Sequence, residues 1–380
     1  MSGSGSNDTL MGIILAFCAL AAVIACNSPV AYLYNDLIQL HVSLQFGEYV
    51  LAKSLVLWIN EGLMALFFLL VTLEIKREMT IGTLNTHSKR ALPFFAAVGG
   101  MVVPALIYIM LTTDQPQLFP GWAIPTATDI VFALSLLGMI VKNCPQSIRS
   151  FLLALAVFDD IGAIIIIAVY YSNDISFFSA GMIVLCSGLL YYFHQKKLAI
   201  LTPYILVGLI LWVCVLKSGV HATLAGIIVA LALPDKGNHS LAARVEHGLT
   251  PWVNYCILPL FAFTNAGITF AGTTTSHFFH IMPLAIIAGL VVGKQVGITV
   301  CSYLAVKLRL ASLPASMKWQ DVLGVSMLCG VGFTMSLFIG TLAFETELEQ
   351  FALWIRVGVM GGSILSALCA WIYFRVVRRA

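Results

Sequence analysis

The chain has 380 residues, of which 60% are apolar and only 10% are charged, with a net charge of +3. Soluble domains are about 45–50% apolar and about 25% charged, so this composition cannot supply a water-soluble fold with a polar surface. It predicts an integral membrane protein and excludes nucleic-acid binding and soluble catalysis as functions. The nine cysteines show no disulfide framework and no zinc-site spacing, and we expect them to act as small apolar side chains.

The amino-terminal residues 1–8 form a Gly/Ser-rich polar stretch that contains no Lys or Arg. A cleavable signal peptide needs a basic region ahead of its apolar segment, so we expect the first apolar helix to be retained. Residues 1–10 are then a cytoplasmic tail, and residues 11–380 form a single transmembrane domain.

Apolar stretches of about membrane-spanning length, divided at Pro, Gly and charge clusters, predict an all-α protein with about twelve transmembrane helices. Their centres lie near residues 19, 65, 102, 131, 160, 186, 207, 227, 261, 294, 333 and 364. An even number of spans puts both ends of the chain on the same side of the membrane.

The basic residues of the loops support this division, because Lys and Arg accumulate in cytoplasmic loops. Sixteen of the 20 lie in alternate loops or at the carboxyl end: Lys76, Arg77, Lys89, Arg90, Lys142, Arg149, Lys196, Lys197, Lys236, Arg244, Lys307, Arg309, Lys318, Arg375, Arg378 and Arg379. The intervening loops hold only Lys53 and Lys217, so both termini are expected in the cytoplasm. The longest outer loop, residues 27–54, alternates polar and apolar residues around Gly47, which predicts a small hairpin.

Five charged residues lie deep within the predicted spans: Asp129, Asp159, Asp160, Lys294 and Arg356. A charge at mid-bilayer costs about 2.5–3.5 kcal/mol on insertion scales, so such residues normally line an ion or proton path. Asp159 and Asp160 point about 100° apart on one helix, so one can pair with Lys294 while the other faces water. Adjacent carboxylates suit competition between a cation and protons. The alternative is an Asp159–Lys294 bridge that only fixes two helices together.

Two predicted spans are interrupted within the membrane. The fourth contains Pro125 and two threonines before Asp129, and the eleventh reads Cys329-Gly-Val-Gly-Phe-Thr-Met-Ser336. Unwound backbone at membrane depth is tolerated where it lines a cavity or is buried in protein, and paired interruptions point to a transporter's midplane site. We expect spans three to five to repeat, inverted, as spans ten to twelve. Asp129 near positive helix ends and Lys294 near negative ones could neutralise these ends.

Motifs along nearly the whole chain resemble those of the NhaA-type sodium/proton antiporters. They are Thr128-Asp129, Phe158-Asp159-Asp160-Ile-Gly162-Ala, Lys217-Ser-Gly-Val-His221-Ala-Thr-Leu-Ala-Gly226, Leu258-Pro-Leu-Phe-Ala-Phe263, Gly293-Lys294 and Cys329-Gly-Val-Gly-Phe-Thr-Met-Ser336. The resemblance implies a bacterial inner-membrane antiporter that expels Na⁺ or Li⁺ in exchange for protons, two per cation. It implies no cofactor, since the ions are substrates.

The resemblance also implies roles for the intramembrane residues. Asp160 and Asp159 would carry the cation and the protons, with Asp160 in direct contact with the transported Na⁺. Lys294 would pair with Asp159, and Thr128 with Asp129 would occupy the crossing of the two interrupted helices.

Further implications concern architecture and regulation. A core of spans three to five and ten to twelve, about residues 91–171 and 281–377, would rock against an interface bundle of the remaining spans. Homodimers would join through the outer hairpin. A cluster at the cytoplasmic mouth would respond to pH: Glu74, Arg77, Glu78, Arg244, Glu246 and His247. Ordinary solvated loop charge is the alternative interpretation of this cluster.

Three positions depart from the pattern of the family that the chain resembles. Glu61 stands where Asp more often follows Asn60, Thr250 where some members have His, and Gln295 where Pro often follows Lys294. The first two are expected to shift the pH response, and the third to alter the helix around Lys294.

Three other kinds of membrane protein also carry charged residues within their spans. An intramembrane aspartyl protease places its two aspartates in Tyr-Asp and Gly-x-Gly-Asp settings, which neither Thr128-Asp129 nor Phe158-Asp159-Asp160 matches. A cation channel needs a filter-like loop, which the sequence lacks, and a core lysine opposes passive cation flow. A Na⁺-coupled nutrient symporter remains open on physical grounds, and only the resemblance favours antiport.

Overall fold

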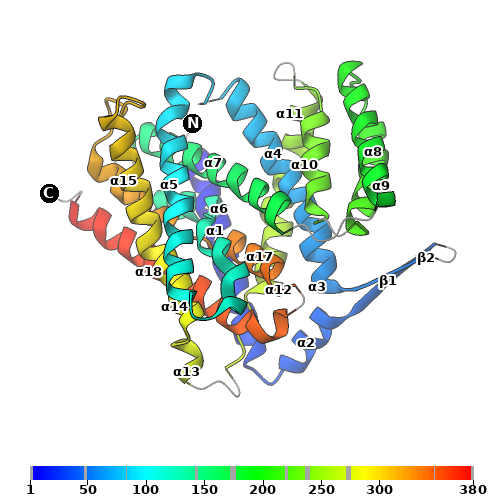
Figure 1. Cartoon of the computed structure of the whole chain (residues 1–380), viewed down its shortest axis with the longest axis horizontal. Helices are drawn as coiled ribbons and strands as arrows, with labels where there is room; N and C mark the ends of the chain where they lie inside the picture. The colour runs from blue at the N-terminus through cyan, green and yellow to red at the C-terminus, as the bar shows by residue number, and fades with distance from the viewer. Residues whose placement is uncertain are drawn as a thin grey trace. The chain divides into compact units, whose positions relative to one another are not determined.

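The structure is a computed structural model that describes residues 3–46, 49–82, 84–141, 144–171, 177–218, 221–235, 240–270, 275–345 and 347–377. In these residues the regular structure is helical apart from one two-stranded ladder, as the sequence predicts (Figure 1). The chain divides into two compact units, which are described separately. The first comprises Met1–Asn27, Thr83–Ala163 and Ala266–Ala380, and the second Ser28–Gly82 and Ile164–Asn265.

Six helical stretches in the described residues are long and apolar enough to cross a membrane. They are Asp8–Cys26, Leu55–Thr80, His87–Thr112, Gln146–Tyr170, Ile281–Lys307 and Gln350–Val376. Two further helix pairs are bent at short breaks, and each pair passes the same test of length and composition. The described residues therefore contain six to eight candidate spans.

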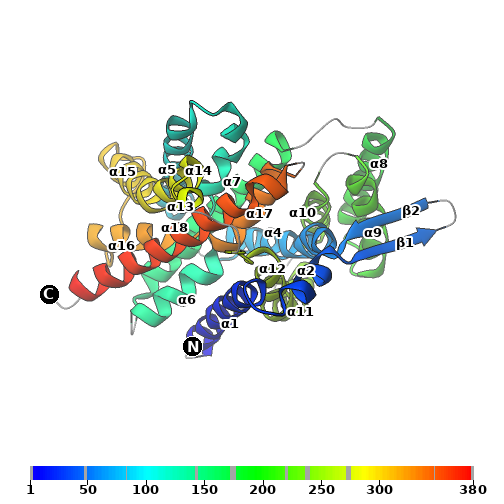
Figure 2. The ribbon, with the colours of Figure 1, turned by 90° about the horizontal axis from the view of Figure 1, so that it is seen from below.

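The first unit contains the two bent pairs. Its helices are α1 (Gly3–Cys26), α5 (His87–Thr112), η2 (Pro116–Thr126), α6 (Ile130–Ile140), α7 (Gln146–Tyr170, to Ala163), α13 (Thr275–Phe278), α14 (Ile281–Ala288), η4 (Gly289–Gly293), α15 (Lys294–Lys307), α16 (Trp319–Cys329), α17 (Phe333–Ala343) and α18 (Leu348–Val377). Helix α1 begins at Gly3, inside the segment 1–10 expected to be a tail. Figure 2 shows α18 running past α14, α16 and α17, against which it packs.

Helices α5 and α15 lie side by side because each presents glycine at the crossing (Figure 1). A Cβ atom on Gly99 would overlap the carbonyl oxygen of Gly297, and a Cβ on Gly297 would overlap that of Gly99. Small residues allow such backbone contact between membrane helices. Since Lys294 lies one turn before Gly297, this contact sets the depth at which its side chain enters the unit.

The second unit is built from shorter or interrupted helices. They are α2 (Ala31–Gln39), α3 (Leu55–Trp58), η1 (Ile59–Leu63), α4 (Met64–Thr80), α8 (Phe177–Gln195), α9 (Thr202–Leu216), α10 (Thr223–Ala232), α11 (Leu241–Trp252), η3 (Val253–Ile257) and α12 (Leu258–Asn265). The segments η1 and η3 are single π-helical turns inside longer helices, as η4 is in the first unit. Such turns are frequent at functional sites.

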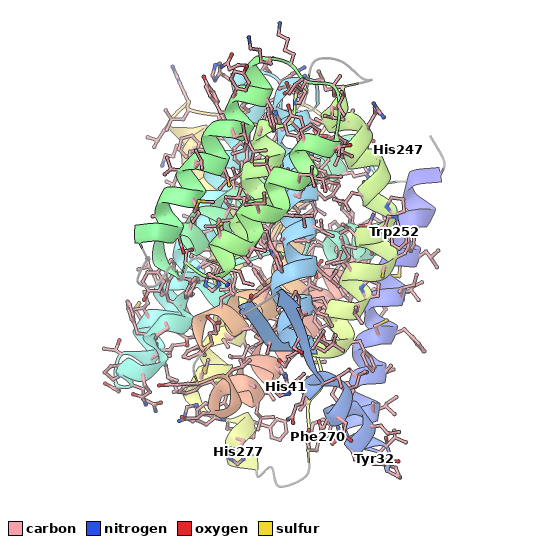
Figure 3. The ribbon with its side chains drawn as sticks, turned by 90° about the vertical axis from the view of Figure 1, so that its right-hand side faces the viewer. Tyr32, His41, His247, Trp252, Phe270 and His277 are labelled. Atoms are coloured by element: carbon pink, nitrogen blue, oxygen red, sulfur yellow. The ribbon has the colours of Figure 1, made fainter. Side chains whose placement is uncertain are left out.

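Strands β1 (His41–Phe46) and β2 (Tyr49–Ser54) pair antiparallel, with His41 opposite Ser54 and Phe46 opposite Tyr49. The ladder lies in the segment whose alternating sequence predicts a hairpin. Within this unit, Figure 3 shows His41 and Tyr32 toward one end and His247, on α11, toward the other.

Candidate functional site

The two bent pairs meet at their breaks. η2 and α6 are joined at an angle of 48°, and α16 and α17 at 47°. Pro120 and Pro125 lie inside η2, where their missing N–H groups disfavour a regular α-helix. The backbone N–H of Asp129 donates to the carbonyl of Val331 at 2.7 Å, so one break contacts the other directly.

The Asp129 side chain accepts hydrogen bonds from the first turns of two helices, α6 and α17. Its Oδ1 accepts from the N–H of Phe132 at 3.0 Å, which makes it the N-cap of α6. Its Oδ2 accepts from the N–H of Thr334 at 3.0 Å and from the Thr334 hydroxyl at 2.5 Å, in the first turn of α17. A buried carboxylate between two helix N-termini neutralises their partial positive charge. Asp129 is therefore placed to stabilise both helix ends electrostatically, and both of its oxygens are already hydrogen-bonded.

Asp159, Lys294 and Thr128 form a buried hydrogen-bonded triad. Asp159 Oδ2 accepts from Lys294 Nζ at 2.6 Å and from Thr128 Oγ1 at 2.6 Å, while Lys294 Nζ also lies 2.8 Å from Thr128 Oγ1. The carbonyl of Cys329 lies 2.9 Å from Thr128 Oγ1 as well. A hydroxyl has one hydrogen, so Thr128 donates either to Asp159 or to Cys329. The site can therefore rearrange one proton without moving a heavy atom.

One oxygen of this triad is unsatisfied. Within the described part of the chain, Asp159 Oδ1 is buried and has no hydrogen-bond partner. Asp160, the next residue of α7, is also buried, with 5% of its surface exposed. A buried oxygen without a donor is costly, so this position suits a ligand that arrives and leaves.

A resident metal site is not formed by these residues. No three His, Cys, Asp or Glu side chains of the described residues converge closely enough to hold a metal ion. Any cation at Asp159 and Asp160 would need hydroxyl or carbonyl oxygens as further ligands.

The second unit brings most of the expected pH-responsive residues together. Arg77 Nη1 donates to Glu246 Oε1 at 2.5 Å, and Arg77 Nη2 lies 3.3 Å from Glu78 Oε1. With Glu74 and His247, Arg77 and Glu246 line a cavity of about 460 Å³. Burial raises the pKa of Glu246 above its ordinary value, and the charge of Arg77 opposes this shift.

Arg244, also predicted for this cluster, is exposed and does not line the cavity. Lys76 and Asp235 line it instead, and the sequence reasoning did not assign them there. Lys76 Nζ donates to the carbonyls of Leu231 at 3.0 Å and Leu233 at 2.6 Å, at the end of α10. The only sequence signal for Lys76 was its charge beside Arg77 at the end of span two.

Glu61, Thr250 and Gln295, the three residues that depart from the family pattern, have the following surroundings. Glu61 accepts from Lys53 Nζ at 2.8 Å on both carboxylate oxygens, and its side chain is 15% exposed. Thr250 donates its hydroxyl to the carbonyl of Glu246 at 2.7 Å. Gln295 lies in an uninterrupted α15, although the π-helical turn η4 ends directly before Lys294.

Other buried polar contacts were not anticipated. Asn60 and Asn265 exchange amide hydrogen bonds of 3.1 and 2.9 Å, and both are buried. Uncharged amides give no signal in a search for intramembrane charges. Arg356, one of the five charges within the predicted spans, donates to the carbonyl of Gly267 at 2.6 Å.

Comparison with known proteins identifies the family. Residues 5–374 match the family model described as Na⁺/H⁺ antiporter 1. A curated relative named Na(+)/H(+) antiporter NhaA from Pseudomonas putida is 50% identical over 367 residues, 96% of this chain and 94% of that protein. Another of that name, from Rhodospirillum rubrum, is 49% identical over 382 residues, 98% of this chain and 96% of that protein. The resemblance seen in the motifs is confirmed, and the chain belongs to the NhaA family of Na⁺/H⁺ antiporters, which are transporters and not enzymes.

Proposed function

We propose that this protein expels Na⁺ or Li⁺ from the cytoplasm in exchange for protons, two per cation, by alternating access. The observation that carries the proposal is the buried Lys294–Asp159 pair, which leaves one oxygen of Asp159 unsatisfied beside buried Asp160. Because Na⁺ and protons compete for the same carboxylates, release of the cation is linked to uptake of protons. The ions are substrates, and we expect no cofactor.

The proposed competition follows from the charges. Asp159 and Lys294 balance one another, so the ionised site carries the single negative charge of Asp160. A hard cation prefers oxygen ligands, which Asp160, Asp159 Oδ1 and the Thr128 hydroxyl supply. Its positive charge favours the ionised form of both carboxylates, so one proton leaves Asp159. The second proton is the one displaced from Asp160.

Such a cycle is electrogenic. Two protons enter for each cation that leaves, so one net positive charge moves inward. A membrane potential that is negative inside drives this movement by about 2.3 kcal/mol per 100 mV. The proton gradient and the potential then act together to expel Na⁺.

For topology we propose twelve spans in the bacterial inner membrane, with both termini in the cytoplasm and the interrupted helices at its midplane. The basic loops support this orientation. His41 of the hairpin and His247, next to Glu246 in the chain, lie toward opposite ends of the second unit, which suits an outer hairpin and a cytoplasmic cluster (Figure 3). The inverted repeat of spans three to five and ten to twelve belongs to the same proposal.

We further propose that residues 91–171 and 281–377 form a moving core and that the remaining spans form an interface bundle. Homodimers would join through residues 27–54, where β1 and β2 form a two-stranded ladder in the described part of the segment. The cluster around Arg77 and Glu246 would set the pH response. Glu246 is buried beside Arg77 in the cavity lining, so gain or loss of its proton as pH changes would alter the net charge of this pair.

The experiment that tests the transport proposal uses purified protein in sealed vesicles with an imposed pH gradient. Addition of Na⁺ or Li⁺ should collapse the gradient, more strongly as pH rises, and K⁺ is the comparison cation. Asp160→Asn should abolish this response while expression and folding stay normal, because the amide keeps the volume but carries neither charge nor a titrating proton. Asp114→Asn, in an exposed turn, is the matched control. Normal exchange by Asp160→Asn would refute the carboxylate mechanism.

A further inference from the structure

A cavity of about 900 Å³ opens in the first unit, where α5 begins and where the chain leaves α15. Three basic residues line it: His87 and Arg90 on α5, and Arg309 just after α15. None of the described residues that line it is acidic. Concentrated positive charge around a cavity favours an anionic ligand.

The same cavity has an aromatic surface. Phe94, Phe95 and Phe158 line it, and the ring of Phe94 contacts both others edge to face, at centroid distances of 5.5 and 5.6 Å. Phe94 is 45% exposed. A small inorganic anion gains no apolar contact from three phenyl rings, whereas an amphiphile would place its apolar groups against them. The lining therefore fits a ligand with an anionic head and an apolar body.

The backbone at Arg309 adds an independent observation. Helix α15 ends in a motif in which the N–H of Arg309 donates to Val306 at 3.0 Å and that of Leu310 donates to Ala305 at 2.9 Å. Arg309 has a φ of +59°, in the left-handed region where glycine is usual and other residues cost about 1–2 kcal/mol. Arg309 therefore occupies a turn that glycine would fit better, and its side chain lines the basic cavity.

The start of α5 favours an anion as well. Its N-cap, Thr86, makes no side-chain capping bond, and Ser88 in the first turn lines the cavity. The first N–H groups of a helix lack intrahelical partners and carry partial positive charge, so they bind phosphate readily. Arginine adds a planar fork that matches phosphate oxygens.

We propose that this cavity binds an anionic phospholipid, whose phosphate contacts Arg309, Arg90 and the start of α5 and whose glycerol and upper chains lie against the phenyl rings. The membrane that surrounds this protein supplies the ligand. Basic pockets between transmembrane helices on the cytoplasmic side bind such headgroups, and the basic loops place this cavity on that side.

The test titrates delipidated full-length protein with phosphatidylglycerol, phosphatidylcholine and inorganic phosphate, and measures bound lipid by native mass spectrometry. Arg309→Gly should weaken one phosphatidylglycerol site about tenfold or more, the loss expected for a charge-assisted hydrogen bond. Its unfolding temperature should stay equal or rise, because glycine suits the turn. Ser312→Glu, which puts a negative charge into the cavity lining, should weaken the same site.

Lys197→Gly is the matched control, since Lys197 has a φ of +52° in the same kind of helix end but does not line this cavity. It removes an equal charge and should leave this site unchanged. Equal phosphatidylglycerol affinities in Arg309→Gly and the unchanged protein would overturn the proposal. So would displacement of phosphatidylglycerol by an equal concentration of inorganic phosphate, which would assign the cavity to a free anion.

Discussion

Lys294 Nζ lies 2.6 Å from Asp159 Oδ2, with the lysine side chain fully buried and that of the aspartate 1% exposed. Burying two charges costs several kcal/mol for each ion, and their attraction offsets this cost only with good geometry and further hydrogen bonds. Thr128 supplies such a bond, but Asp159 Oδ1 has none among the described residues. The pair is therefore poorly optimised for stability, which agrees with a role in transport.

Lys294→Ala is expected to destabilise the protein by about 3–5 kcal/mol, because it leaves an unpaired carboxylate at Asp159 in a buried position. Thermal unfolding in detergent measures the effect. The double variant Lys294→Met with Asp159→Leu should regain much of the stability while remaining unable to transport. Full stability of Lys294→Ala without any exchange would contradict the bridge and show a direct proton-carrying role for the lysine.

Asp129→Ala should destabilise the protein by about 1–4 kcal/mol, the sum expected for two helix N-caps of about 0.5–2 kcal/mol each. Asp129→Asn should lose less stability than Asp129→Ala, because its one remaining side-chain oxygen still accepts a hydrogen bond. The new amide nitrogen cannot accept the hydrogen bonds that Thr334 donates to Asp129. Denaturation followed by circular dichroism gives the order of the two variants. Asp114→Ala, in an exposed turn, should unfold like the unchanged protein.

Glu246→Gln should change how stability depends on pH. Burial raises the folded-state pKa of Glu246, so the folded chain binds the proton more tightly than the unfolded one. The resulting stabilisation is complete below the ordinary value of 4.5 and is lost as pH rises through the raised pKa. Unfolding temperatures measured from pH 4 upward should therefore fall more steeply for the unchanged protein than for Glu246→Gln. Parallel profiles would show that Glu246 titrates normally.

Gly297→Ala should separate α5 from α15 and destabilise the protein by about 1–3 kcal/mol or more, because the added Cβ overlaps the backbone of Gly99. Exchange should fall as well, since Lys294 is displaced with the helix. The matched control is Gly188→Ala in α8, where a Cβ meets nothing within 4 Å. It should be neutral or stabilising by about 0.5–1 kcal/mol, as expected for alanine in a helix. Equal losses in both variants would contradict the close-approach argument.

The charged part of the site could be predicted because an ionisable residue in an apolar span is costly in any fold. Asp129, Asp159 and Lys294 were found in this way, and glycine and proline marked the two bends. The exact partners could not be predicted, since spacing along the chain does not reveal which oxygen of Asp159 the lysine contacts. The charges predicted that Lys294 pairs with one of the two adjacent aspartates, and the resemblance to a family favoured Asp159.

Uncharged and backbone features escaped the sequence reasoning. The amide pair of Asn60 and Asn265 joins positions far apart in the chain, and neither residue carries a charge that would mark it. The π-helical turns η1, η3 and η4 depend on local packing and not on a recognisable motif. Helices α9 and α10 have 15 and 10 residues, fewer than the about 20 that a predicted membrane span needs.

The double cap by Asp129 has a consequence for synthesis. Thr334, which donates two of its hydrogen bonds, follows 205 residues later in the chain. When the ribosome has just made α6, the carboxylate of Asp129 can already cap α6. Helix α17, whose Thr334 supplies the other hydrogen bonds, has not yet been made. The first interrupted span is therefore inserted unfinished, and its final hydrogen bonds form only after α17 has entered the membrane. A chain truncated before α17 should leave Asp129 Oδ2 without the two donors of Thr334.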